Sequence, residues 1–508
     1  MTGRHRWENE AKVSVLDALL RIGRALPGIR RDAAAARHLA PTLATLDVDL
    51  DLPSSERMTG WVEALCRTPH RRPGTPEGRQ AEEWVLARFR EIGLEHLTAD
   101  PVPITVWTPN RWSLQIGEER LPCFFVVNTG FTGERGVTAP LVYVGKGRPG
   151  DFAWKDVRGK IVVADTAFPL LPSGLLLKLV RACYHLSDPG RELRLTNWQY
   201  LNFVRKNFVG GSVSAGEAPD REVYWQAQKR GAAGICLILK NQPAGTNSHY
   251  GPYDGLMKPM PGLWVGKFEG RALRRAARAG TEATLVLEGT QRPGEMRNVW
   301  GVLPGVSEET ILVTSHLDSP FRGAVEDGAG VAQLLAQAEA WSRIPVAGRP
   351  RTLVFVAGAG HFYGWEGGHA FARRNAAWMK RARVLITLEH LGGKEVREKG
   401  RAYEETGRPA LSVIFTSPDP KLIASVVRAL ERKPARMTAA VPATLLGPVP
   451  PTDAMGYVLE TGIPLISWIG CPYYLLDEHD TPDKLDTCSL HALSETVGEM
   501  IKLQMLAD

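Results

Sequence analysis

The stretch ILVTSHLDSPFRGAVEDGAGVAQLLAQAEAW, residues 311–341, indicates the fold class. It opens with an apolar run typical of a buried strand and, after a glycine-rich loop, continues as a helix from Gly328 to about Trp341. Helices are also expected from Gly367 and Lys421. Further apolar runs are NVWGVLPG at 298–305, RTLVFVAGAG at 351–360, RVLITLEHLGG at 383–393, LSVIFTSPD at 411–419 and PLISWIG at 464–470. Such alternation predicts an α/β fold, a mostly parallel sheet covered by helices on both faces.

The chain of 508 residues is longer than one hydrophobic core usually organises, so two or three domains are expected. An amphipathic helix over residues 12–26 is followed by an alanine-rich tether. The expected units are an N-terminal helical extension (1–50), the two parts of a main domain (51–128 and 293–508) and an inserted β-rich domain (129–292). The insert carries an extra helical segment at 168–222, which is either a cap over a site or, as we favour, a packing unit.

Composition limits the classes of partner and compartment. The net charge of +7 is spread over the whole length, whereas a nucleic-acid partner would need a concentrated basic stripe. No apolar run approaches the roughly 18 residues of a membrane span, and the N-terminal stretch lacks the apolar middle of a signal peptide. Six widely spaced cysteines predict neither a disulfide framework nor a structural zinc site, so a cytoplasmic location is expected.

Ionisable residues recur where the predicted strands end. His316 and Asp318 follow ILVTS, His361 follows TLVFVAGAG, and Glu389 and His390 follow VLITL. Ligands of such sheets bind at the carboxyl ends of the strands, and zinc takes imidazole nitrogen and carboxylate oxygen as ligands. A lone histidine there is more often structural, but the ordered set predicts a metal site.

The order of these motifs resembles that of the zinc exopeptidases of the aminopeptidase Y, bacterial leucyl aminopeptidase, glutamate carboxypeptidase and transferrin-receptor type. SHLDS (315–319) followed by GAVEDGAG (323–330) is similar to their first metal motif. This resemblance implies that His316 is a zinc ligand, that Asp318 orients it, and that Asp327 bridges two ions. DVRGKIVVAD (156–165), AQKRGAAGICLIL (227–239) and PGLWVGKFEGRAL (261–273) resemble the protease-associated domain inserted in that family.

The next motif departs from the family, whose strand ends in a catalytic glutamate followed by a ligand glutamate. In AGAGHFYGWEGGHAF (357–371), one alignment puts His361 in the base position and Phe362 in the ligand position. The other alignment puts Gly360 and His361 there, and then Glu366 or Glu326 would have to serve as the base. Both alternatives stay open at the level of sequence.

Two later motifs are closer to the family. Glu389 stands where the family has a ligand aspartate, whereas His390 should point to the opposite face of an extended strand. In PPTDAMG, Asp453 stands where a substrate-side aspartate is common.

The last motif, YYLLDEHDTPDKLD (473–486), keeps DTPDKLD, but the position of the family's terminal histidine falls on Leu476. Asp477 or His479 could replace that histidine, and Tyr474 is expected on the substrate side.

The leading hypothesis is therefore a zinc-dependent aminopeptidase-like hydrolase acting on short peptides or amino-acid derivatives, with one or two ions. The expected ligands are His316, Asp327, Glu389 and one of His361, Asp477 and His479. The alternative is an inactive pseudopeptidase that uses the same cleft for binding or assembly. Self-association of the chain is left open.

Overall fold

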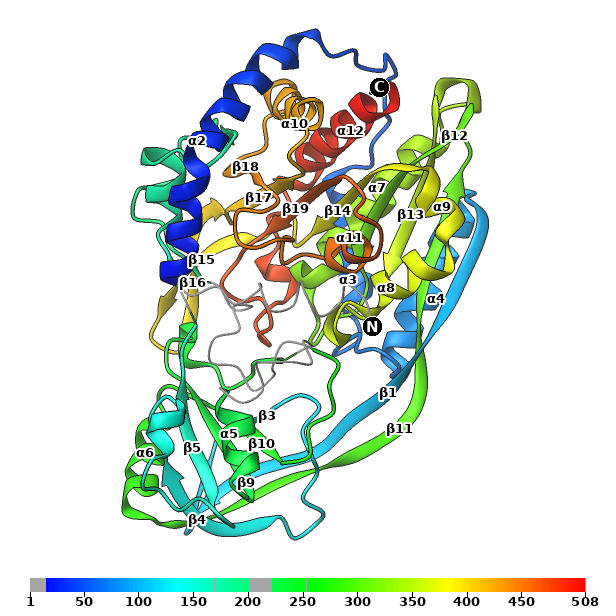
Figure 1. Cartoon of the computed structure of the whole chain (residues 1–508). Coiled ribbons are helices and arrows are strands. Elements are labelled where there is room, and N and C mark those ends of the chain that lie inside the picture. The colour runs from blue at the N-terminus through cyan, green and yellow to red at the C-terminus, as the bar shows by residue number, and fades with distance from the viewer. Residues whose placement is uncertain (1–14, 169, 201–221, 253, 508) are drawn as a thin grey trace.

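The computed structural model describes residues 15–168, 170–200, 222–252 and 254–507, and Figure 1 shows two lobes joined by a long ribbon. The larger lobe is a sheet flanked by helices, which confirms the predicted α/β class. Among the described residues, no helix is long and apolar enough to cross a membrane.

The central sheet of the larger lobe runs in the order β11-β13-β12-β14-β19-β17-β18-β7. β13, β12, β14 and β19 are parallel neighbours, and β17 and β18 are parallel to each other. The pairs β11–β13, β19–β17 and β18–β7 are antiparallel, so the sheet is mixed. The strands are β11 (Glu282–Leu303), β12 (Ser307–His316), β13 (Arg351–Gly358), β14 (Ala382–Glu389), β17 (Ser412–Thr416), β18 (Thr438–Pro442) and β19 (Leu465–Gly470). A small hairpin, β15 (Lys394–Lys399) and β16 (Ala402–Pro409), follows β14.

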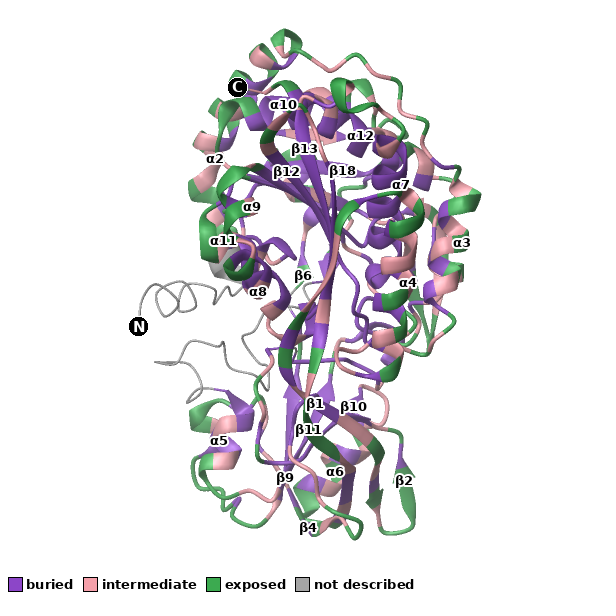
Figure 2. Ribbon diagram, turned by 90° about the vertical axis from the view of Figure 1, so that its right-hand side faces the viewer, coloured by how far each residue is buried: buried purple, intermediate pink, exposed green. Residues whose placement is uncertain are grey.

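Helices cover both faces of this sheet, and Figure 2 shows the buried strands between them. One face carries α3 (Ser55–Leu65), α4 (Pro76–Ile92), α7 (Gly330–Ser342) and α12 (Leu490–Leu506). The other carries α8 (Glu366–Arg374), α9 (Ala376–Arg381) and α11 (Ala454–Thr461), while α10 (Pro420–Arg432) packs against α12. Side-chain caps explain where two of these helices begin. The Thr75 side chain accepts a hydrogen bond from the Gly78 N–H at the start of α4, and the Asp419 side chain accepts one from the Leu422 N–H at the start of α10.

The smaller lobe consists mainly of residues within 129–292, the range of the predicted insert, but its strand β3 precedes residue 129. Its strands are β3 (Phe124–Phe125), β4 (Val137–Tyr143), β5 (Ile161–Thr166), β9 (Gly234–Leu239) and β10 (Gly262–Gly266), with helices α5 (Val223–Lys229) and α6 (Gly270–Ala279). The ribbon between the lobes consists of β11 and the antiparallel β1 (Glu95–Ile116), which also pairs with β2 (Glu119–Leu121).

The extra segment of the insert is described only over residues 170–200. It holds one helical turn (Leu175–Leu179) and the short strands β6 (Leu170–Leu171), β7 (His185–Ser187) and β8 (Gln199–Tyr200), so this part is mostly not helical. β7 adds an edge strand to the central sheet through its pairing with β18. The rest of the predicted segment lies outside the described residues.

The N-terminal helix α2 (Val15–Leu39) is longer than the sequence suggested, because the alanine-rich stretch read as a tether continues the helix. Alanine has the highest helix propensity, and Ala33 and Ala36 are buried where α2 packs against α10. Residues 12–14 of the predicted helix lie outside the described part.

The core of the larger lobe depends on α7, whose apolar residues are buried on nearly every side. Trp341 is fully buried at the end of this helix, whereas Trp154 is fully exposed. We expect Trp341→Ala to lower the free energy of unfolding by about 3–5 kcal/mol, because it removes a large buried side chain and leaves a cavity. The matched change Trp154→Ala should lower it by less than about 0.5 kcal/mol in the same urea titration, and equal effects would contradict this packing.

Candidate metal centre

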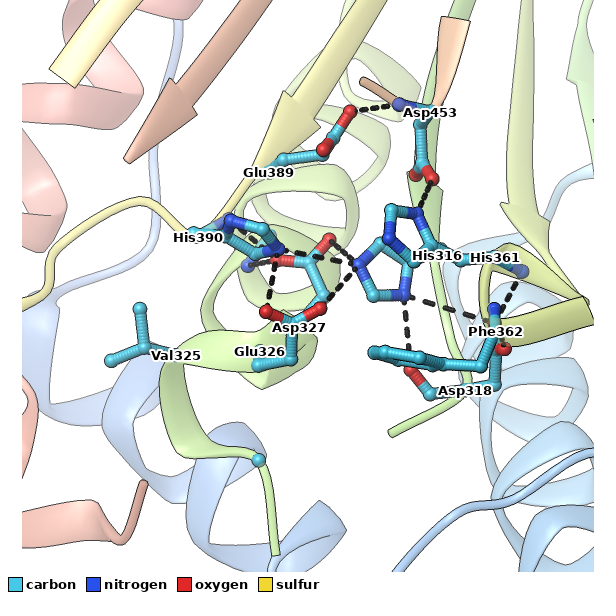
Figure 3. A network of polar contacts seen from close by, with 12 residues as sticks. His316, Asp318, Val325, Glu326, Asp327, His361, Phe362, Glu389, His390 and Asp453 are labelled. Atoms are coloured by element: carbon cyan, nitrogen blue, oxygen red, sulfur yellow. Dashed lines mark hydrogen bonds and ion pairs between the residues drawn. The ribbon is translucent and has the colours of Figure 1, made fainter. Parts of the chain in front are cut away.

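A buried cluster of ionisable side chains lies at the carboxyl ends of β12, β13 and β14 (Figure 3). His316 is the last residue of β12, Glu389 is the last residue of β14, and His361 follows β13. Because these strands are parallel neighbours, their ends bring residues far apart in sequence to one edge. The predicted gathering of His316, His361 and Glu389 at one edge of the sheet is therefore present.

Three donor groups of the cluster surround one point. Glu326 lies between two imidazoles, with Oε1 3.3 Å from His316 Nε2 and Oε2 3.0 Å from His390 Nε2. The two Nε2 atoms are 3.5 Å apart. Tetrahedral zinc with bonds of about 2.0–2.1 Å holds its ligand atoms about 3.3 Å apart, so these spacings match three corners of a tetrahedron.

The outer nitrogen of each imidazole faces a backbone carbonyl, an arrangement that favours metal binding. His316 Nδ1 is 2.9 Å from the carbonyl oxygen of Asp318, and His390 Nδ1 is 3.3 Å from that of Gly470. A carbonyl can only accept, so each Nδ1 is a donor and each Nε2 faces inward, where it offers a lone pair once a cation displaces its proton. These two nitrogens and the buried Glu326 Oε1, which has no hydrogen-bond partner among the described residues, fit a cation.

Glu326, rather than Asp327, lies between the imidazoles. The Asp327 carboxylate accepts from Ser315 Oγ at 2.6 Å, the His390 N–H at 2.7 Å and the Gly330 N–H at 3.1 Å. Its Oδ2 remains 3.8 Å from His316 Nε2. Asp327 thus positions the loop and the His390 backbone, and one of its carboxylate oxygens also forms a possible metal-binding group with His316 and His390.

His390 also departs from the expectation that it points away. Its backbone φ is +54°, in the left-handed region, so the alternation of an extended strand ends at Glu389. The His390 side chain consequently enters the cluster beside Glu326 (Figure 3).

A second set of donors adjoins the first and consists of His361, Glu389 and Asp453. His361 Nδ1 is 2.7 Å from Asp453 Oδ1, and the Asp453 N–H donates to Glu389 Oε1. Glu389 Oε2 is buried and receives no hydrogen bond from the residues that the structure describes. The predicted substrate-side Asp453 is therefore part of the cluster itself.

The structure also shows which residue of the ambiguous motif faces the cluster. The His361 ring stacks on the His316 ring, with centroids 4.1 Å apart, whereas Phe362 presents an apolar ring to His316. The Asp318 carboxylate accepts hydrogen bonds from the backbone N–H of His361 at 3.2 Å and of Phe362 at 3.0 Å. Asp318 therefore positions this turn in addition to contacting His316. Only His361 offers a donor atom here.

Four expected site residues lie outside the cluster. Asp477 Oδ1 lies 2.6 Å from His479 Nδ1, and Asp477 Oδ2 accepts a hydrogen bond from the Tyr403 hydroxyl at 3.1 Å. Asp477 and His479 therefore hydrogen-bond to each other. Glu366 pairs with Arg373 on α8. The Tyr474 hydroxyl donates to backbone carbonyls of residues 394 and 484, away from the donors described above.

Two supporting residues were not assigned a role from the sequence. The Asp480 carboxylate accepts from the N–H groups of Val325 and Glu326 at 2.9 and 2.8 Å. The fully buried Arg71 donates to carbonyls on both sides of the same loop, among them those of Leu317 and Gly323. The retained DTPDKLD motif was a signal for Asp480, whereas nothing in the sequence distinguished Arg71 from other arginines.

The charges of the cluster are strongly perturbed. Burial would lower the pKa of His390, but Glu326 raises this pKa to about 9. Burial raises the pKa of Asp327 to about 7 and, together with Asp453, raises that of Glu389 well above its ordinary value. The site thus gathers more acid than its histidines neutralise, which is the electrostatic setting that a divalent cation relieves.

Comparison with known proteins agrees with this geometry, because residues 298–501 match the model of peptidase family M28. This matched range, residues 298–501, is referred to as the M28 domain. The matched range carries every donor of the cluster. No curated protein matches the sequence.

Solved structures support the same scaffold for the M28 domain and its insert. A zinc aminopeptidase from Bacillus subtilis is 16% identical with a TM-score of 0.62, over 89% of this chain and 95% of that one. An M28 peptidase precursor from Shewanella amazonensis is 19% identical with a TM-score of 0.62, over 94% and 98%. An aminopeptidase from Aneurinibacillus is 21% identical with a TM-score of 0.59, over 88% and 93%. These likenesses show the fold and confirm the resemblance to the zinc exopeptidase scaffold.

The placement of Glu326 can be tested by zinc affinity, measured by competition with a chromophoric chelator. We expect Glu326→Gln to weaken zinc binding more than 100-fold, because it removes the carboxylate between the imidazoles. Asp327→Asn should weaken zinc binding about 10–100-fold, which is the usual loss of metal affinity when a residue that orients the ligands is changed. The exposed Glu308→Gln serves as the control, and a larger loss in Asp327→Asn would return the ligand role to Asp327.

Proposed function

We propose that the M28 domain is a metal-dependent aminopeptidase-like hydrolase that holds one zinc ion on His316, Glu326 and His390. The observation that carries the proposal is the spacing of their donor atoms, 3.0–3.5 Å, with both Nδ1 atoms facing backbone carbonyls. A bound zinc ion supplies a Lewis acid next to the scissile carbonyl.

His361 is proposed as the general base. Its Nδ1–H donates to Asp453 Oδ1 at 2.7 Å, so Nε2 is the basic nitrogen, which would take a proton from water and return it to the leaving amine. The stacked His316 ring and the Asp318 carboxylate fix this imidazole in place. An imidazole is a suitable base near neutral pH.

Glu389 is proposed to receive the amino group of the substrate. Its Oε2 lacks a hydrogen-bond partner and Glu389 lines the pocket described below, so an incoming N–H donor would satisfy it. Short peptides and amino-acid amides remain the proposed substrates, with the protease-associated-like insert limiting access.

A single ion is proposed because apolar residues occupy two positions at which the family has metal ligands. Phe362 and Leu476 stand where further ligands would be needed, and both side chains are apolar and buried. The same two residues favour the alternative function, a pseudopeptidase that binds without catalysis.

A reducing compartment such as the cytoplasm is also proposed. The six cysteines are free and Cys488 is exposed, as suits a chain kept under reducing conditions.

Metal content and turnover distinguish hydrolase from pseudopeptidase. We expect the purified chain to bind one equivalent of zinc and to hydrolyse leucyl-p-nitroanilide, with turnover lost on chelation and restored by zinc. Bound zinc without turnover of any aminoacyl-nitroanilide would favour the pseudopeptidase, and neither zinc nor turnover after supplementation would exclude the metal site.

The role of His361 is separable from metal binding. We expect His361→Ala to lower kcat about 10²–10⁴-fold while zinc affinity changes far less than in Glu326→Gln, because the imidazole moves a proton. Asp453→Asn should lower kcat and alter the pH profile of kcat. His369→Ala is a control on α8, where the imidazole contacts Glu460 instead. Loss of zinc in His361→Ala would make His361 a ligand.

A further inference from the structure

A pocket of about 120 Å³ adjoins the metal centre and extends over one face of the central sheet. Glu326, His361, Glu389 and His390 form one end of it. The proposed catalytic chemistry uses only this end, so the function of the remaining, much larger part is unassigned.

The floor of the pocket is a row of side chains across four adjacent strands. Glu389 of β14 pairs with Ile469 of β19, which pairs with Val413 of β17. On the same face, Phe415 of β17 pairs with Val441 of β18. Strands lie about 4.8 Å apart, so the three spacings from Glu389 to Val441 cover about 14 Å.

The walls are apolar and belong to parts of the chain outside the matched M28 range as well as within it. They include Ile22 of α2 and Leu176 and Leu177 of the extra segment, facing Leu446 and Leu476 of the M28 domain. Among the described lining residues, those at the metal end are the only ones that carry an ionisable acid or imidazole.

The polar members of the lining already have protein partners. Gln199 Nε2 donates to the Cys471 carbonyl, the Tyr200 hydroxyl to Gln242 Oε1, and Ser173 Oγ to the Asn197 carbonyl. A peptide backbone placed along these walls would bury N–H and C=O groups without compensation, at a cost of about 1–3 kcal/mol for each group. A charged side chain would cost more.

An aliphatic chain meets every one of these conditions. It needs no hydrogen bonds, and an extended alkyl chain with bonds of about 1.5 Å advances about 1.3 Å per bond, so about ten bonds match the span. The side chain of a single amino acid fills less than the whole length.

We infer that this pocket binds the long aliphatic chain of an acyl group whose amide carbonyl lies at the metal centre, so that amides of long-chain carboxylic acids are substrates. The hydrolytic part of this inference rests on the proposed function, whereas binding of the chain does not. In the reaction, the oxygen of water bonds to the carbonyl carbon and the C–N bond breaks. One proton of water goes to the leaving nitrogen and the other is released to solvent, which gives a long-chain carboxylate and a free amine.

Binding is tested by calorimetry with straight-chain carboxylates from butanoate to tetradecanoate on chelator-treated full-length protein. We expect the affinity to rise about fourfold per methylene until the pocket is filled near ten carbons and then to level off. Val413→Trp, which fills the middle of the floor, should weaken dodecanoate binding at least tenfold. Val346→Trp, at an exposed position away from the pocket, should leave it unchanged.

Leu446→Trp fills the wall and replaces Val413→Trp if that variant fails to give the wild-type circular dichroism spectrum. A flat affinity series, or dodecanoate binding that neither tryptophan weakens, would overturn the inference.

Turnover separates the inference from the proposed function. With zinc supplied, dodecanoyl-p-nitroanilide is expected to have a kcat/KM at least tenfold above that of butanoyl-p-nitroanilide. Leucyl-p-nitroanilide turnover without this chain-length preference would overturn the inference and leave the hydrolase standing. Chain-length-dependent binding without turnover of any nitroanilide would retain the pocket as an acyl-chain site and overturn both the hydrolytic part and the proposed function.

Discussion

Burial of acid at the end of one sheet is the constraint on which the arrangement of this protein depends. Six carboxyl groups lie in or beside the cluster, all of them buried: Asp318, Glu326, Asp327, Glu389, Asp453 and Asp480. Carboxylates removed from water are costly unless hydrogen bonds or positive charges compensate them. Backbone N–H groups satisfy Asp318, Asp327 and Asp480, and these three therefore act as structural supports.

The acids without full backbone compensation are the ones that face a possible cation or substrate. Within the described part of the chain, the Glu326 carboxylate contacts the imidazoles of His316 and His390, and Glu389 Oε2 has no hydrogen-bond partner. Arg71 and Asp480 hold the loop of Glu326 through complementary hydrogen bonds. Arg71 donates to carbonyl groups of the loop, and Asp480 accepts from its N–H groups. The supports thus fix the geometry of the donors while leaving their inner atoms available for chemistry.

The same sheet that gathers the donors also forms the floor of an apolar pocket. β14 contributes Glu389 to the cluster, and its neighbours β19, β17 and β18 continue the surface with Ile469, Val413 and Val441. Parts outside the M28 domain, α2 and the extra segment, supply the opposite wall. The proposed metal centre and the proposed site for a long apolar group are therefore contiguous, and α2 and the extra segment line the second.

The sequence by itself determined the sheet, the helices on its faces and the strand ends at which ionisable residues gather, because apolar periodicity and chain order are local properties. It also identified His316 and the support from Asp318. Only the tertiary structure showed that Glu326 and His390 lie in the same cluster as His316, next to Asp327 and Glu389. These neighbours differ by one position, and the direction of a side chain at the end of a strand depends on a left-handed φ at residue 390 and on hydrogen bonds from residues far away in the chain. No periodicity encodes such contacts, so they became visible only once the strands were placed side by side.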